Sequence, residues 1–175
     1  MKKKIIVIFS ISIVILFFAA ILFNFVICPK KYKNFAVAYS EEFDLELALV
    51  YSVIKVESDF NDKAISKSGA VGLMQILPST GKWIAGKLGV EFDNETLFSP
   101  EQNIKFGCFY LRYLFNKFDD LDSVICAYNA GEGKVLDWIE GGKLKKDKID
   151  YQETKNYLEK VSHYYRLYNN KLINL

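Results

Sequence analysis

Histidine is nearly absent from this sequence, and this scarcity excludes several kinds of active site. The single copy is His163, in the middle of a helical pattern, where we interpret it as a surface or core residue. A Ser-His-Asp or Cys-His site needs a histidine beside its nucleophile, and multi-histidine metal sites need more than one. Glycine-rich loops of the Gly-x-Gly-x-x-Gly or Walker type are also missing, so nucleotide chemistry has no support. Carboxylates are left as the candidate catalytic groups.

Cysteine is scarce as well, and its three copies indicate neither a metal site nor a disulfide framework. Cys28, Cys108 and Cys126 lack metal-ligand spacing, and their number is odd. Cys108 and Cys126 lie in apolar helical surroundings, where a free thiol behaves as a small hydrophobic group. The sequence therefore predicts two core thiols and no metal site.

Acidic residues are absent from the start of the chain, because all 21 of them follow Pro29. The run from Ile5 to Cys28 is uncharged, and its members that are not apolar are Ser10, Ser12 and Asn24. About 20 apolar residues, at 1.5 Å each, are enough to cross a hydrocarbon core of roughly 30 Å. This composition predicts a membrane-spanning helix.

The flanks of this run favour an uncleaved anchor over a removed leader. A cleavable signal peptide has a shorter apolar core, followed by a small-x-small site. Here the small residues Ala19 and Ala20 lie in mid-run, and no small residue precedes Cys28 as a lipoprotein signal requires. We predict a signal anchor over residues 1–28 and a basic linker over 29–33, with cleavage or lipidation at Cys28 as alternatives. A default orientation with the N-terminus inside places a single-pass protein in the cell membrane with its domain on the extracytoplasmic side.

The excess of basic residues belongs to the flank of this anchor. Without Lys2, Lys3 and Lys4, the 23 basic residues fall to 20, against 21 acidic ones. A near-neutral remainder gives no indication of nucleic-acid binding.

Proline is rare, with three copies, and strict apolar alternation is absent after residue 31. The length suits one globular domain, and helical spacing of its apolar residues predicts a mainly α fold. We expect Asp44 to cap the second helix and Asp122 to cap the fifth. An irregular segment, with room for a small hairpin, is expected over 61–78, and a polar loop over 141–148. The predicted helices cover 34–42, 45–58, 78–88, 100–118, 122–129, 135–139 and 151–168.

Glu57 stands out among the carboxylates by its position on a helix. It lies three residues after Ile54 and four after Val53, so it continues an apolar stripe. Desolvation there raises the pKa of a carboxyl group and suits it to act as a general acid on a glycosidic oxygen. The alternative from periodicity alone is an ordinary helix-end glutamate that reaches solvent.

Four short motifs occur in an order that resembles the lytic transglycosylases. Together they cover nearly all of the chain after residue 33, and their order and spacing are highly specific. They are Val56-Glu57-Ser58-Asp59-Phe60-Asn61, the segment from Gly69 to Gln75 with Pro78-Ser79-Thr80, Ala127-Tyr128-Asn129-Ala130-Gly131, and Glu153-Thr154 with Tyr157 and Val161. The sequence is similar to the soluble lytic murein transglycosylase catalytic domain of the lysozyme superfamily.

This resemblance implies a lysozyme-like helical domain over 34–170 that acts on peptidoglycan glycan strands. In that family the glutamate of the Glu-Ser motif, here Glu57, is the single general acid and base. It cleaves the β-1,4 bond between N-acetylmuramic acid (MurNAc) and N-acetylglucosamine (GlcNAc) and leaves a 1,6-anhydro end. Proximity within one sugar replaces a positioned water, so the chemistry requires no cofactor.

The resemblance also implies a set of substrate-binding residues around Glu57. For each of them a structural role as a cap, turn or core residue is the alternative. The set is Ser58, Ser66, Met74, Gln75, Tyr128, Asn129 and Tyr157.

One position departs from the family pattern. Many relatives carry proline after the Ala-Gly of the asparagine motif, where this chain has Glu132. An added acid at the rim of the cleft is expected to alter the preference for peptide stems. Two other functions stay open from the sequence: a lysozyme-type muramidase on the same scaffold, and an idle glycan-binding module of an envelope machine.

Overall fold

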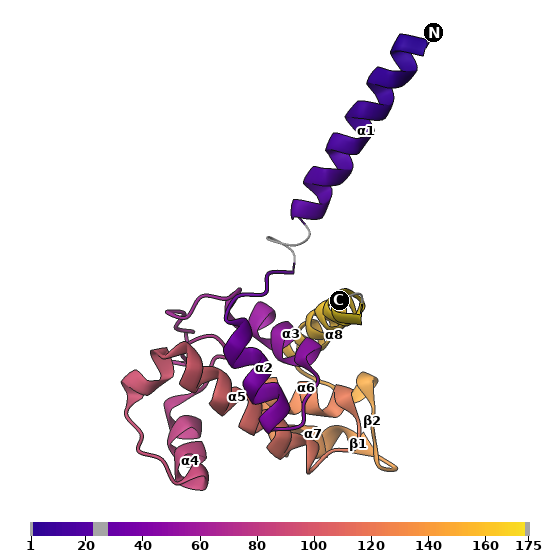
Figure 1. The fold of residues 1–175 in the computed structure, drawn as a ribbon. Helices are drawn as coiled ribbons and strands as arrows, with labels where there is room; N and C mark the ends of the chain where they lie inside the picture. The colour runs from indigo at the N-terminus through magenta and orange to yellow at the C-terminus, as the bar shows by residue number, and fades with distance from the viewer. Residues whose placement is uncertain (1, 23–27, 174–175) are drawn as a thin grey trace. The chain divides into compact units, whose positions relative to one another are not determined.

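The computed structural model describes the backbone of residues 2–22 and 28–173 (Figure 1), and the side chains of 9–22 and 28–170. The chain divides into two compact units, Met1–Lys31 and Tyr32–Leu175.

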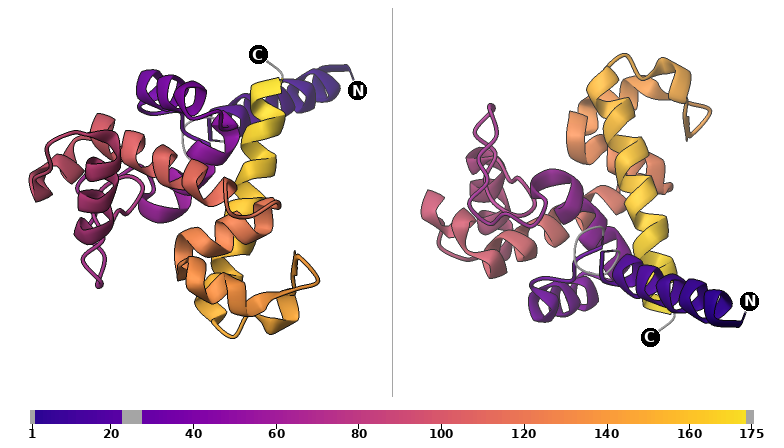
Figure 2. Two further views of the ribbon diagram at one scale, coloured as in Figure 1. Left: turned by 90° about the horizontal axis from the view of Figure 1, so that it is seen from below. Right: turned by 90° about the horizontal axis from the view of Figure 1, so that it is seen from above.

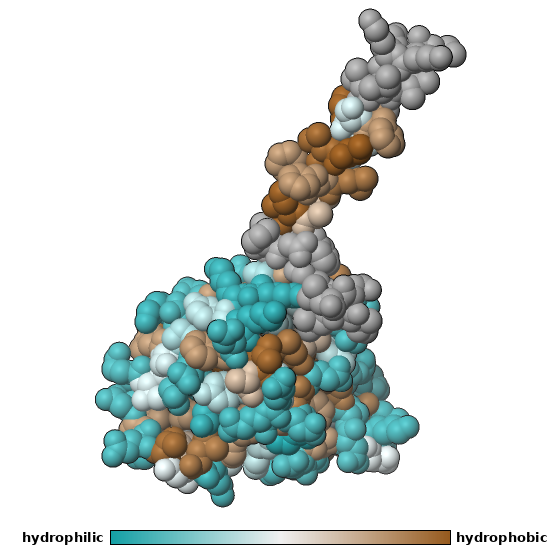
Figure 3. Space-filling model, viewed as in Figure 1, coloured by the Kyte–Doolittle hydropathy of each residue, from teal (hydrophilic) through white to brown (hydrophobic). Residues whose placement is uncertain are grey.

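The first unit contains one helix, α1 (Lys2–Leu22). Its described side chains are mostly apolar and exposed, as the brown surface of Figure 3 shows; Phe9, Leu16 and Phe17 are examples. Among the described residues, no helix combines the length and the hydropathy needed to cross a membrane. Residues 1 and 23–27 of the predicted anchor lie outside the described part of the chain.

The second unit is mainly helical, which confirms the mainly α part of the predicted fold class. Two short 3-10 helices, η2 (Asn94–Phe98) and η3 (Lys146–Lys148), accompany the α-helices. Strands β1 (Ile139–Glu140) and β2 (Lys143–Leu144) form an antiparallel hairpin with Ile139 opposite Leu144. The α-helices are α2 (Lys33–Glu42), α3 (Leu47–Ser58), α4 (Pro78–Leu88), α5 (Pro100–Phe115), α6 (Leu121–Ala130), α7 (Glu132–Trp138) and α8 (Gln152–Ile173).

The long helix α8 lies along α3 and α6, while α5 packs against α2 and α6 (Figure 2). The rings of Tyr51 and Tyr168 join α3 to α8, stacked with centroids 5.2 Å apart. The predicted core thiols are confirmed, since Cys108 and Cys126 are fully buried. The central core also includes Leu49, Ile54, Ile104, Leu111, Leu114, Val124, Val161 and Tyr168, none more than 2% exposed.

Local end signals place several helices where the sequence predicts them. Helix α4 begins at Pro78 and ends at Leu88, and the following Gly89 adopts a left-handed φ of 67°. Helix α5 begins after Ser99, whose hydroxyl accepts a hydrogen bond from the Gln102 backbone N–H. Proline at the first helical position and glycine after the last follow the usual asymmetry of helix ends.

Both predicted aspartate caps are wrong. Asp44 closes the turn after α2 with a φ of 50° and pairs with Arg112, while α3 begins after Glu46. Asp120 caps α6 by accepting a hydrogen bond from the Ser123 N–H at 2.8 Å, and Asp122 lies inside the first turn. In both cases the residue that precedes the helix lies two positions from the predicted cap. Several acidic residues occur near each helix start, and each aspartate among them has the side chain expected of an N-cap.

Other boundaries also differ from the prediction. Helix α5 ends at Phe115 rather than Phe118, and α7 begins at Glu132, three residues before the predicted start at Val135. The region expected as a polar loop, 141–148, contains strand β2 and the 3-10 helix η3, and Ile139, the end of a predicted helix, begins strand β1. The irregular segment over 61–78 contains two isolated bridges, Ile65 with Val71 and Val71 with Ile76.

Candidate active site

Glu57 lies in the last turn of α3, on the side of the helix that carries the buried Val53 and Ile54. Burial raises the pKa of its carboxyl group from 4.5 to about 7, and the nearby Glu153 adds to the rise. A hydrogen bond from Tyr157 acts in the opposite direction. A carboxyl group with this pKa exists in both protonation states near neutral pH, as a general acid and base requires.

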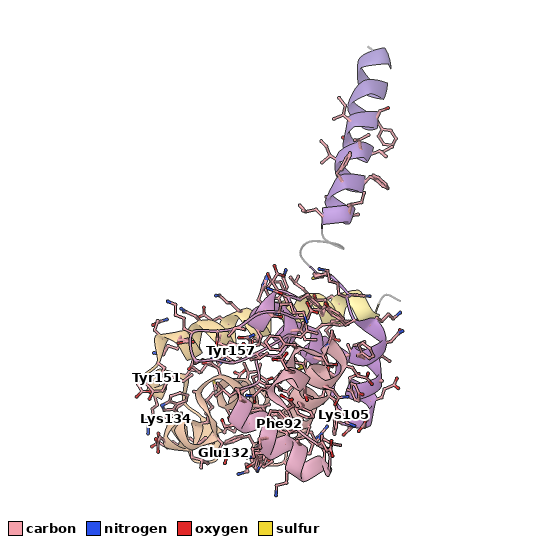
Figure 4. All side chains as sticks on the ribbon, turned by 90° about the vertical axis from the view of Figure 1, so that its left-hand side faces the viewer. Phe92, Lys105, Glu132, Lys134, Tyr151 and Tyr157 are labelled. Carbon is pink, nitrogen blue, oxygen red and sulfur yellow. The ribbon has the colours of Figure 1, made fainter. Side chains whose placement is uncertain are left out.

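Tyr157 reaches Glu57 from α8, a helix one hundred residues away in sequence. Its hydroxyl donates a hydrogen bond of 2.7 Å to Glu57 Oε1. The residue is 6% exposed and projects from α8, where Figure 4 labels it. Packing of α8 along α3 therefore fixes one carboxylate oxygen and leaves Oε2 for other partners.

The segment from Gly69 to Gln75 is held in place by a buried asparagine of α5. Asn103 Oδ1 accepts a hydrogen bond of 2.7 Å from the Met74 N–H. Its Nδ2 donates to the carbonyls of Val71 at 2.9 Å and Leu97 at 2.8 Å. Gly72 has a φ of +80°, and a Cβ there would meet Asn103 Nδ2 at 2.3 Å. The glycine is thus required both for its backbone conformation and for the close approach of Asn103.

Two hydroxyl groups join this segment to the helices around Glu57. Ser58 Oγ donates to the Leu73 carbonyl at 2.8 Å, and Tyr128 Oη donates to the Met74 carbonyl at 2.8 Å. Burial raises the pKa of Tyr128, with the charge of Glu57 as a further cause, so both groups lie in one electrostatic environment. The Met74 side chain itself is fully buried, close to Gly107.

The other predicted site residues have different surroundings. Gln75 Nε2 donates to the Gly72 carbonyl at 2.8 Å and to the Ala64 carbonyl at 3.2 Å, which leaves its amide oxygen for other partners. Asn129 Oδ1 accepts a hydrogen bond of 2.8 Å from the buried Thr154. Ser66 Oγ accepts from the Ala70 N–H at 2.9 Å, which is a turn contact within its own segment.

A cavity of about 520 Å³ lies between α4, α5 and the start of α7. It is lined by Ser79, Thr80, Trp83, Tyr110, Tyr113, Gly131, Glu132 and Gly133. The Tyr110 ring lies 5.5 Å, between centroids, from the ring of Tyr128. The cavity therefore adjoins Tyr128, which is hydrogen-bonded to the segment beside Glu57.

Sequence reasoning missed three features of this site: Asn103, the proximity of Glu153 to Glu57, and the aromatic lining of the cavity. The signal for Asn103 is faint, because a polar residue beside the apolar stripe of a helix has the same pattern whether it is buried or solvated. The cavity joins Trp83 to Tyr110 and Tyr113 across 27 or more positions, and no local pattern indicates such a contact.

Replacement of Glu57 by glutamine is expected to stabilise the protein at high pH. The folded state binds the Glu57 proton more tightly than the unfolded chain, so the wild-type free energy of unfolding falls as pH rises from about 4.5 to about 7 and then levels off. The variant lacks this loss, and its advantage above pH 7 is up to about 3 kcal/mol. Urea unfolding of both proteins across this pH range measures the difference. A constant difference at all pH values would show that the carboxyl group has an ordinary pKa.

Comparison with known proteins places these features in a family context. The sequence model of the Transglycosylase SLT domain matches residues 34–151. The chain is 30% identical to the membrane-bound lytic murein transglycosylase C of Haemophilus ducreyi, over 76% of this chain and 44% of that protein. It is also 30% identical to the soluble lytic murein transglycosylase of Salmonella typhimurium, over 78% of this chain and 22% of that protein. The chain thus spans less than half the length of either relative.

The fold also has solved counterparts. The 70-kDa soluble lytic transglycosylase of Escherichia coli superposes with a TM-score of 0.77 at 28% identity. The match covers 83% of this chain and 25% of that one.

Proposed function

This chain belongs to the family of transglycosylase SLT domains, and from this premise we propose that it is a membrane-anchored peptidoglycan lytic transglycosylase with Glu57 as its single general acid and base. The observation that carries the proposal is the Glu57 carboxyl group, whose pKa burial raises to about 7 and whose Oε1 accepts a hydrogen bond from Tyr157. The substrate is the glycan strand of peptidoglycan, and the bond cleaved is MurNAc-β-1,4-GlcNAc.

In the first step, protonated Glu57 donates its proton to the glycosidic oxygen. The C1–O bond of MurNAc breaks, and GlcNAc leaves as an alcohol. Because Tyr157 donates to Oε1, the Glu57 proton resides on Oε2, which is the oxygen left to face the substrate. The positive charge that develops at C1 is stabilised by the neighbouring N-acetyl group of MurNAc.

In the second step, the Glu57 carboxylate removes the proton from the C6 hydroxyl of the same MurNAc. The C6 oxygen bonds to C1 and closes the 1,6-anhydro ring, and Glu57 returns to its protonated form. Water is not consumed. An intramolecular nucleophile explains how one carboxylate is sufficient, since proximity supplies what a positioned water otherwise provides.

The roles of the surrounding residues are proposed from the polar atoms that their hydrogen bonds within the domain leave available for substrate. Asn129 presents its amide N–H groups and Gln75 its amide oxygen to the glycan, because their other polar atoms are engaged within the domain. Tyr128, Ser58 and Met74 act by position, through the hydrogen bonds that tie the Gly69–Gln75 segment to α3 and α6. Ser66 is proposed as a further glycan contact from its place in the motif region alone, because its hydrogen bonds lie within its own turn.

Product analysis tests this proposal. Purified residues 29–175, incubated with peptidoglycan sacculi, are expected to release muropeptides with 1,6-anhydro ends. Mass spectrometry distinguishes them from the products of a muramidase, which are heavier by one water and reducible by borohydride. Reducing ends alone would support the hydrolase, and wall binding without cleavage would support an idle binding module.

The pKa of Glu57 predicts the alkaline limb of activity. The rate constant kcat/KM is expected to fall above pH of about 7, because the acid is then ionised in the free enzyme. The Tyr157 hydrogen bond lowers this pKa, so Tyr157→Phe is expected to move the limb to higher pH while it reduces the rate. Profiles of kcat/KM against pH for both proteins measure the shift. An alkaline limb at the same pH in both would show that the Tyr157 hydrogen bond does not set the pKa of Glu57.

The anchor is proposed from the sequence, since the run from Ile5 to Cys28 carries no charge. In α1 the apolar side chains of residues 9–22 are exposed, as a lipid-facing helix requires. We expect the full chain to sediment with membranes after carbonate washing and to be released by protease from the outer face only. Recovery of the intact chain in the soluble fraction would contradict this proposal.

A further inference from the structure

Glu132, the residue that departs from the family pattern, is the first residue of α7 and is held by two side chains of the α5 region. Lys117 Nζ lies 2.7 Å from its Oε2, and Tyr113 Oη lies 3.4 Å from its Oε1. The Lys117 ammonium also lies 4.8 Å from the centroid of the Tyr113 ring. A carboxylate and an aromatic face thus hold one ammonium group together, which is a favourable combination.

The same two recognition groups also face the cavity. Glu132 and Tyr113 both line it. Two further rings complete the wall. The Trp83 ring lies 4.8 Å from Tyr113 at 70°, and Tyr110 is stacked on Tyr113 at 6.0 Å. The carboxylate therefore lies beside aromatic rings in an open cavity at the surface (Figure 4 labels Glu132).

The cavity is next to the proposed catalytic cluster. Tyr110 contacts Tyr128, and Tyr128 donates a hydrogen bond to the Met74 carbonyl of the segment beside Glu57. Glu132 follows the Tyr128-Asn129 motif by only a few residues along the chain. The cavity is therefore connected to the segment beside Glu57 through Tyr110 and Tyr128.

We propose that the cavity binds an ammonium group of the peptidoglycan substrate, with Glu132 as the counter-ion and the Tyr113 and Trp83 rings as cation-π surfaces. This inference rests on the proposed function and names a specificity determinant of it. Two sources supply such a group in the wall: the side-chain amine of a diamino acid in the peptide stem, and a glucosamine that lacks its N-acetyl group. Lys117 is a competing internal ammonium that weakens the interaction.

The test compares cleavage rates on three matched substrates: glycan strands with stems that carry a free amine, the same strands after acetylation of that amine, and stem-free strands with some glucosamine residues de-N-acetylated. A stem amine recognised in the cavity predicts a kcat/KM about 5- to 10-fold higher on the first substrate than on the second. Recognition of the amino sugar predicts instead that the third substrate is preferred over its N-acetylated form. Equal rates across all of these substrates would overturn the inference.

Variants assign the preference to the cavity. Glu132→Gln is expected to abolish the preference, so that kcat/KM on strands with a free amine falls to that on the acetylated strands. Lys117→Met is expected to enlarge the preference. Glu140→Gln is the matched control, because Glu140 also pairs with a lysine, at 3.1 Å, but lies in the hairpin. Retention of the preference in Glu132→Gln would contradict the assignment.

A binding measurement separates this inference from the proposed function. Trp83 is one of two tryptophans in the chain, so its fluorescence reports on the cavity. Nα-acetyl-lysine amide is expected to change the emission of the wild type but not of Trp83→Phe, and its Nε-acetylated form is expected to bind at least several-fold more weakly. Equal binding of both probes would contradict the inference even if anhydro products form, whereas selective binding without cleavage would contradict the proposed function alone.

Discussion

Glu57→Gln is expected to abolish the release of 1,6-anhydro muropeptides while the protein stays folded. Glutamine has nearly the same shape but can neither donate a proton to the leaving oxygen nor remove one from the C6 hydroxyl. Loss of a general acid and base lowers rates by about 10²- to 10⁴-fold, and here one residue serves both steps. High-performance separation of the products with mass detection measures the loss, and circular dichroism measures the fold.

Asp59→Asn is the matched control for this variant. It removes one carboxylate two residues from Glu57, but the Asp59 side chain is 74% exposed and its partner is Lys55 on the same helix face. The Lys55 side chain is only 11% exposed, but an ion pair whose carboxylate is in water contributes little to stability. We expect near wild-type activity from Asp59→Asn. Activity of Glu57→Gln within a few-fold of the wild type would exclude Glu57 as the acid.

Asn103→Ala is expected to produce the largest loss of stability among the polar residues of the site. The side chain is 1% exposed and satisfies one N–H and two carbonyl groups, those of Met74, Val71 and Leu97. An unsatisfied buried polar group costs about 1–3 kcal/mol, so the expected loss in the free energy of unfolding is roughly 3 kcal/mol or more. Activity is expected to fall with it, because the Gly69–Gln75 segment loses its support. Urea unfolding measures the first effect, and product release under folded conditions measures the second.

Two control variants test whether the loss comes from the hydrogen bonds of Asn103. Asn116→Ala removes an exposed asparagine from the end of the same helix and is expected to change stability by less than about 1 kcal/mol. Asn103→Asp keeps the acceptor for the Met74 N–H but turns a carboxylate oxygen toward two carbonyls, so it is expected to be as damaging as alanine. A stable and active Asn103→Asp would show that the two donated bonds are dispensable.

The sequence supplied different amounts of information for different parts of the site. Glu57 is identifiable from its place on an apolar stripe and from the motif around it, both of which are local. Tyr157 belongs to a recognisable motif, but its hydrogen bond to Glu57 spans one hundred positions and depends on how α8 packs on α3. Asn103 carries no distinctive pattern, and its partners become apparent only when α5 lies against the Gly69–Gln75 segment.

The same division applies to the fold and to the rest of the molecule. By itself the sequence determined the mainly helical class, the proline and glycine ends of α4, the buried thiols and the family, because periodicity, end signals and short motifs are properties of neighbouring residues. Only the tertiary structure decided which of several nearby aspartates caps a helix, the raised pKa of the Glu57 carboxyl group, and the open cavity lined by Trp83, Tyr113 and Glu132. These depend on desolvation and on contacts between distant helices, and neither has a counterpart in the spacing of residues along the chain.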